Sequence, residues 1–134
     1  MNPKYQLSAV SNLKPEELIK KTETILSVKY NILEYLDNKL VFEPGWWVFS
    51  RHKHFTLVDF GEIEFSGKND ETTIKFTYHV NVWVEVIVVP ISIALGFVSN
   101  WFTLLWAAAL LIQLGIKIAL VKESAAAILD SIVK

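Results

Sequence analysis

Two histidines in the middle of the chain have a spacing that could support metal chemistry. His52 and His54 lie in the stretch "SRHKH", and alternate residues of a strand point to the same face. Imidazole nitrogens are common zinc ligands. The side chains that could complete such a site are those of Glu62, Glu64 and His79. Because two ligands alone are a weak signal, the sequence predicts no metal site and gives His52 and His54 only as weak candidates.

The same stretch has a simpler interpretation as a surface that contacts lipid or a partner. Arg51 and Lys53 are basic, and a basic residue near anionic headgroups gains about 1 kcal/mol. Just before them, Trp46 and Trp47 are adjacent, so in a strand their rings point to opposite sides. One ring must then lie outside the core. We therefore predict that Trp46, Trp47, Arg51 and Lys53 are possible partner or lipid contacts.

The remaining polar residues give no sign of an enzyme. The tripeptide Asp59–Gly61 matches the kinase magnesium motif by its letters only, because the other kinase motifs are absent from the sequence. Glu62 and Glu64 share one strand face, which is typical of a solvated surface. The chain has no cysteine, which excludes thiolate chemistry, and a net charge of −1 does not favour nucleic acid. We predict no catalysis, no cofactor and no nucleic-acid partner.

The elements that carry these residues indicate an α+β domain over residues 1–81. Pro15 followed by two glutamates is a helix start, and a helix is predicted over Pro15–Val28. Alternating patterns predict strands. The predicted strands are Tyr30–Leu36, Lys39–Glu43, Phe55–Ser66 and a stretch that alternates from Ile74 to Val86, with Met1–Asn12 as a loose arm or short edge strand. The fold class is therefore an N-terminal helix on a roughly four-stranded antiparallel sheet.

The last third of the chain has a different character. Between Glu85 and Lys117, 31 residues carry no charge. Trp101–Val121 extends about 31 Å as a helix, which matches the hydrocarbon core of a bilayer. The preceding arm, Val82–Val98, is shorter and contains Pro90, which favours the first position of a helix. We predict a C-terminal transmembrane helical hairpin over residues 82–121 with its turn near 99–100.

Two alternatives remain open for this region, namely one full span with a shorter re-entrant or interfacial arm, and a soluble protein that buries both helices. In the membrane interpretation, tryptophans and charged residues mark the interfaces. The predicted interface residues are Trp83, Glu85, Trp101, Lys117 and Lys122. Lys117 is expected to snorkel towards the headgroups. The turn has no lysine or arginine, so both termini are predicted to be cytoplasmic at an inner membrane.

Residues 122–134 form an amphipathic helical tail in this interpretation, with apolar side chains on one face. The tail either extends the second span and packs on its own domain or lies on the membrane surface. As a whole, the sequence indicates a small bacterial-type membrane protein. Its domain is expected to mediate protein interactions as an accessory or regulatory subunit or as a homo-oligomer. An oligomeric transport or channel-like protein and a membrane-bound metal- or ligand-binding domain are the alternatives.

Overall fold

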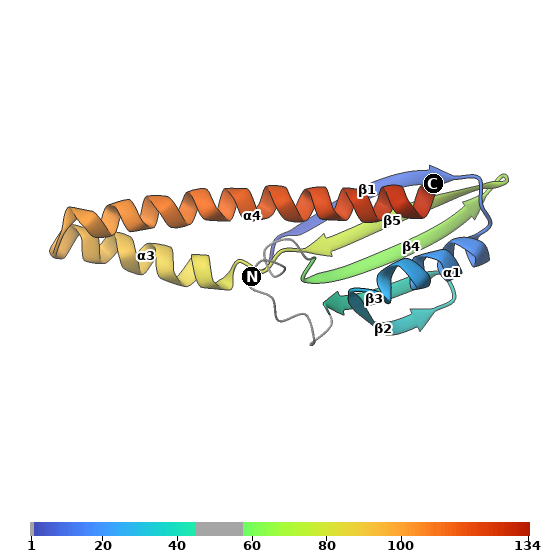
Figure 1. The fold of residues 1–134 in the computed structure, drawn as a ribbon, viewed down its shortest axis with the longest axis horizontal. Coiled ribbons are helices and arrows are strands. Elements are labelled where there is room, and N and C mark those ends of the chain that lie inside the picture. The colour runs from blue at the N-terminus through green and yellow to red at the C-terminus, as the bar shows by residue number, and fades with distance from the viewer. Residues whose placement is uncertain (1, 45–57) are drawn as a thin grey trace.

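The computed structural model describes residues 2–44 and 58–134 of the chain and shows an α+β fold (Figure 1). A sheet occupies one end of the molecule, and two long helices project from it. In chain order the elements are β1 (Lys4–Ser11), α1 (Pro15–Leu26), β2 (Tyr30–Leu36), β3 (Lys39–Pro44), β4 (Phe60–Lys68), β5 (Glu71–His79), α3 (Trp83–Val98) and α4 (Trp101–Val133).

The sheet has five antiparallel strands in the order β1-β5-β4-β3-β2, so the prediction of about four strands is wrong by one. The additional strand is β1, which pairs along its full length with β5, from Lys4 opposite His79 to Ser11 opposite Thr72. Its side chains alternate between half-buried and exposed. The mixed composition of this segment hid the strand, because its neighbour is contributed from far along the sequence.

Strand β5 is shorter than its alternating pattern predicts, because the pattern continues to Val86 but the strand ends at His79. Lys4 of β1 and Phe60 of β4 both pair with His79. Just beyond that point, the amide of Val80 still donates to the carbonyl of Pro3 at 3.2 Å, but the paired register of both neighbouring strands has ended. The chain instead becomes helical at Trp83, where each amide can bond within its own segment.

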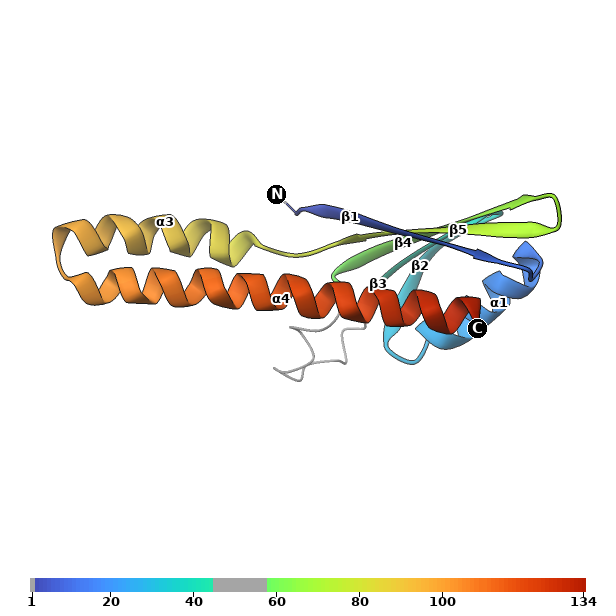
Figure 2. The ribbon, with the colours of Figure 1, turned by 90° about the horizontal axis from the view of Figure 1, so that it is seen from above.

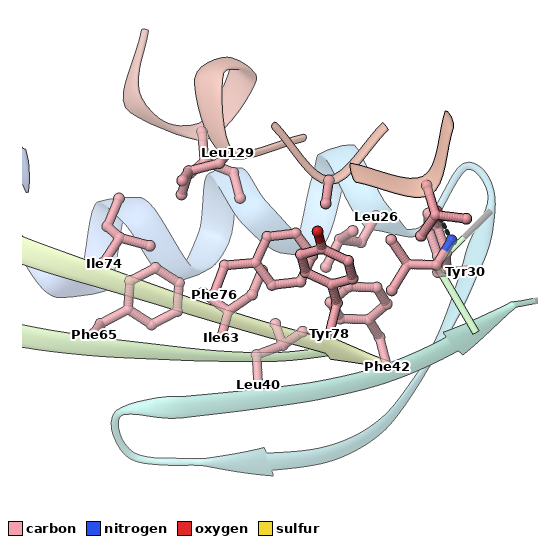
Figure 3. Packing of buried hydrophobic residues seen from close by; sticks show 14 of the residues in the cluster. Leu26, Tyr30, Leu40, Phe42, Ile63, Phe65, Ile74, Phe76, Tyr78 and Leu129 are labelled. Carbon is pink, nitrogen blue, oxygen red and sulfur yellow. Dashed lines mark hydrogen bonds between the residues drawn. The ribbon is translucent and has the colours of Figure 1, made fainter. Parts of the chain in front are cut away.

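One face of the sheet forms the core, and α1 and the C-terminal part of α4 cover it (Figure 2). The sheet contributes a cluster of aromatic and branched side chains, seen from close by in Figure 3. Gly61 on β4 makes room for the ring of Phe42 on β3, since a Cβ atom at Gly61 would collide with that ring. From α4, the buried side chains that belong to this core are Val121, Ala125, Leu129 and Ile132.

The two long helices lie antiparallel and are joined at Ser99 and Asn100, but they are not two equal spans. By length and composition, α4 is the one described helix long and apolar enough to cross a membrane. The prediction of two full spans is wrong for the first helix, because α3 has only 16 residues and contains Pro90 in its interior. Residues 122–133 continue α4 without a break and pack along the sheet, which is the first of the two arrangements predicted for the tail.

Candidate functional site

Polar side chains gather where the sheet ends and the two helices begin. After β5, the side-chain oxygen of Asn81 accepts a hydrogen bond from the amide of Trp83 at 3.1 Å. This bond satisfies one of the amides that have no partner in the first turn of a helix. The helix therefore starts at a fixed residue, and two positions later Glu85 is buried among the described residues.

Glu85 and Lys117 form an ion pair between α3 and α4, with 3.3 Å between the Lys117 Nζ and Glu85 Oε1 atoms. The side chain of Glu85 is only 9% exposed, and that of Lys117 is only 16% exposed. Lys117 also donates a hydrogen bond to the backbone carbonyl of Asn81. The second carboxylate oxygen of Glu85 is buried and has no hydrogen-bond partner among the described residues. We refer to Asn81, Glu85 and Lys117 together as the base of the helical pair.

A small cavity of about 180 Å³ adjoins the base. The residues that line it are Pro44, Asp59, Val80, Asn81, Val84, Lys117 and Val121. Burial raises the pKa of Asp59, while the positive charges of Lys117 and His79 oppose that rise. The cavity is large enough for several waters, each of which occupies about 30 Å³ in the liquid. The arrangement can therefore keep the Glu85–Lys117 salt bridge away from bulk water, and it disfavours the charged form of Asp59.

The structure brings together two residues that the sequence had placed separately at the membrane interface. Lys117 was expected to snorkel towards headgroups, which stays a prediction; in the structure its amine faces Glu85 and the Asn81 carbonyl. Sequence reasoning missed Asn81 and Asp59. An asparagine just before a helix is a recognisable capping signal, so Asn81 could have been found. Asp59 had no such signal, because its environment is created by residues from other elements.

The other predicted interface residues lie at the two ends of the helical pair. Trp83 is the first residue of α3, next to the base, and Trp101 is the first residue of α4, next to the turn. Both rings are largely exposed, and Lys122 is exposed further along α4. The two tryptophans therefore mark opposite ends of the apolar layer formed by α3 and the first part of α4.

The proposed metal candidates His52 and His54 lie outside the described residues, as do Trp46, Trp47, Arg51 and Lys53. Within residues 2–44 and 58–134, no group of three potential ligands is placed to hold a metal ion.

Glu62 and Glu64 lie on the sheet face opposite the core, where each forms an ion pair. Glu62 pairs with Lys39, and Glu64 pairs with Lys75 at 3.7 Å. The hydrogen bond from Lys39 lowers the pKa of Glu62, although partial burial opposes this effect. These carboxylates therefore belong to a charged sheet surface.

The fold and the site together define a class of architecture, namely a sheet domain joined without a linker to an apolar helical pair. The chain matches no family model, no curated protein and no solved structure. Function is therefore inferred from the geometry, and the apolar helices and the open edges of the sheet are the features that bear on it.

Proposed function

We propose that this protein is a non-enzymatic membrane-anchored protein whose sheet domain contacts a protein partner, either another subunit or a second copy of itself. The observation that carries the proposal is the apolar surface of the helical pair. Among the described residues, nineteen of the twenty-five exposed large hydrophobic side chains lie between Trp83 and Leu120. Soluble monomers rarely expose a continuous apolar surface of this extent.

The exposure of α4 separates this helix from the core helix of a soluble protein. Its most apolar 18-residue window has a mean hydropathy of 2.2, and only 11% of that window is buried. A core helix of the same composition would be mostly covered by protein. Lipid is the environment that leaves such side chains in apolar contact on all sides.

The position of the sheet supports a domain that lies on one side of the membrane together with both termini. The last part of α4 packs on the same sheet that precedes α3, so both ends of the helical pair return to one side. Lys117 and Lys122 lie on the domain side of the pair, whereas Ser99 and Asn100 carry no charge at the other end. By the positive-inside rule, this distribution favours a cytoplasmic domain with both termini on that side.

The β2 edge of the sheet is the surface best suited to a protein partner. Within residues 2–44 and 58–134, β2 pairs only with β3, so its outer backbone groups have no strand beside them in this part of the chain. Strands of this kind accept an added strand. Leu33, Tyr35 and Leu36 on this strand are each about half exposed. An extended segment of a partner would pair with the backbone and cover these side chains.

Two measurements test the proposal on the full-length chain. Liposome flotation tests the anchor, and protein that stays at the bottom of the gradient in the presence of liposomes would contradict it.

For the partner, a photo-crosslinking amino acid at Tyr35 in native membranes should give one discrete product that is lost in a Leu33→Glu variant. The same probe at Thr24, exposed on α1, is the matched control. Monomer alone at both positions would refute the partner contact, and the mass of a product would identify a second copy.

A further inference from the structure

We propose that the helical pair enters the bilayer from one side and that its tip stays within the lipid, so that no part of the chain between α3 and α4 reaches the opposite aqueous phase. The tip is defined here as residues 97–102, which include the turn. This inference rests on the proposed membrane anchoring and adds the depth and the topology of insertion.

The length of the pair beyond its base is the first argument. From Glu85 to Val98 the helix rises about 20 Å, and from Trp101 to Lys117 it rises about 24 Å. The hydrocarbon core of a bilayer is about 30 Å thick. With the ion pair at the boundary between lipid and water, the tip reaches the far leaflet but falls several ångströms short of its headgroups. The remaining length of α4 cannot extend the pair, because it is packed on the sheet domain, where Leu114 and Ile118 already contact the core before Val121.

The hydrogen bonds of the turn are the second argument, because a polar group in hydrocarbon must be satisfied internally. The amide and the hydroxyl of Ser99 both donate to the carbonyl of Leu95, each at 2.8 Å. The side chain of Asn100 accepts from the amide of Phe102, and the hydroxyl of Thr103 donates to the Asn100 carbonyl at 2.6 Å. The turn thus satisfies these groups without water.

The composition of the tip agrees with this placement. Phe97 and Val98 are 80% and 87% exposed, and the rings of Trp101 and Phe102 are also exposed and pack together with 4.6 Å between their centroids. The tip carries no charged side chain. A turn that emerged into water would place these four apolar side chains in an unfavourable solvent, whereas a turn within lipid places them among acyl chains.

Close packing allows the two helices to enter as one unit. At Gly96, an added Cβ atom would lie 2.7 Å from the side chain of Leu104 and 2.9 Å from the Thr103 hydroxyl. Small residues at a helix contact let the backbones approach closely, which is the main source of helix association in lipid. At the opposite end, the Glu85–Lys117 ion pair joins the same two helices.

The absence of cysteine from the sequence makes single-cysteine labelling a direct test. Ser99→Cys and Val98→Cys place a thiol at the tip, and Thr24→Cys places one on α1 as the matched control. Each full-length variant is reconstituted into phosphatidylcholine–phosphatidylglycerol vesicles and treated with a membrane-impermeant maleimide before and after the vesicles are opened. We expect Thr24→Cys to be fully labelled after opening, and both tip variants to remain unlabelled until detergent is added.

Labelling of both tip variants from the aqueous phase of opened vesicles, with the protein still in the floating fraction, would overturn the inference and show that the turn crosses the membrane. Loss of flotation would instead refute the anchoring itself, so the two failures are distinguishable. As an independent measure of depth, a fluorophore on the tip thiol should be quenched most strongly by nitroxides attached deep in the acyl chains. Strongest quenching by headgroup nitroxides would also contradict a tip within the lipid.

Discussion

Replacing Lys117 by methionine tests the physical role of the base most directly. Methionine keeps an unbranched apolar side chain of similar length but removes the ammonium group. The variant therefore leaves the carboxylate of Glu85 buried between the helices without its cation. It also leaves the backbone carbonyl of Asn81 without the hydrogen bond from Lys117.

The size of the effect follows from how little water reaches this pair. Removing one partner from a buried ion pair typically costs 3–5 kcal/mol, because a charge remains buried without compensation. The side chain of Glu85 is 9% exposed and that of Lys117 is 16% exposed. Because some water still reaches the pair, the lower end of that range applies. Neutralising a free glutamate at pH 7 costs about 3.7 kcal/mol, which limits the penalty for the charge itself. We expect a loss of about 3 kcal/mol, or roughly 10 °C in the unfolding midpoint.

The assay is thermal unfolding in mild detergent, followed by circular dichroism at 222 nm, on four variants. Lys117→Met and Glu85→Leu alone should each be strongly destabilised. The double variant should recover most of the loss, because two apolar side chains need no charge partner. Lys122→Met, which removes an exposed lysine from the same helix, is the matched control and should differ little from the parent.

An additive result would refute this reasoning. If the double variant loses as much stability as the two single variants together, Glu85 and Lys117 do not interact in the folded protein. A Lys117→Met variant as stable as Lys122→Met would likewise show that water, and not Lys117, solvates the Glu85 carboxylate.

Three further predictions concern the sheet domain and its contact with α4, and thermal unfolding in detergent checks each of them. Gly61→Ala forces a methyl group against the ring of Phe42 and should lower the free energy of unfolding by about 1–3 kcal/mol. In the control Gly115→Ala, the added methyl group meets no atom within 4 Å, so the variant should be neutral or more stable by up to about 1 kcal/mol. Burial raises the pKa of Asp59, so its charged form is disfavoured in the folded state and stability falls as the pH rises through the folded pKa. Asp59→Asn should therefore raise the unfolding midpoint at pH 7 and leave it unchanged near pH 3. Leu129→Ala removes a buried side chain of α4 from the core and should cost about 2–5 kcal/mol, with a loss of sheet signal in circular dichroism at the same temperature.

Local signals predicted those parts of the fold that depend on neighbouring residues. Pro15 and the two glutamates after it set the start of α1, and the helix begins at that proline. The alternation in β4 and β5 identified both strands, and the apolar residues Ile63 and Phe65 of β4 are buried. β1 could not be assigned firmly, because its partner is β5, more than sixty residues later. Strand order depends on such distant pairings, which a single sequence does not specify.

Two residues of the base, Glu85 and Lys117, were predictable from the sequence, but their contact was not. Glu85 and Lys117 flank the uncharged stretch, and a turn at Ser99 and Asn100 brings them to similar heights along antiparallel helices. Whether they face each other could not be read from the pattern. Apolar periodicity marks the buried face of a helix only when the opposite face is polar, and both helices are apolar on nearly all sides in this region.

The connections between sheet and helices determine what the anchor can do for the domain. Val80 and Val82, which link β5 to α3, are buried in the core. On the other side, α4 continues from the apolar layer into the core without a break, and its 33 residues extend about 50 Å. A domain on a flexible linker samples many orientations above a membrane, but neither connection here can act as such a linker. In the proposed anchored arrangement, the β2 edge would be presented at a fixed height and angle, which would lower the entropic cost for a membrane-bound partner that approaches in the matching orientation.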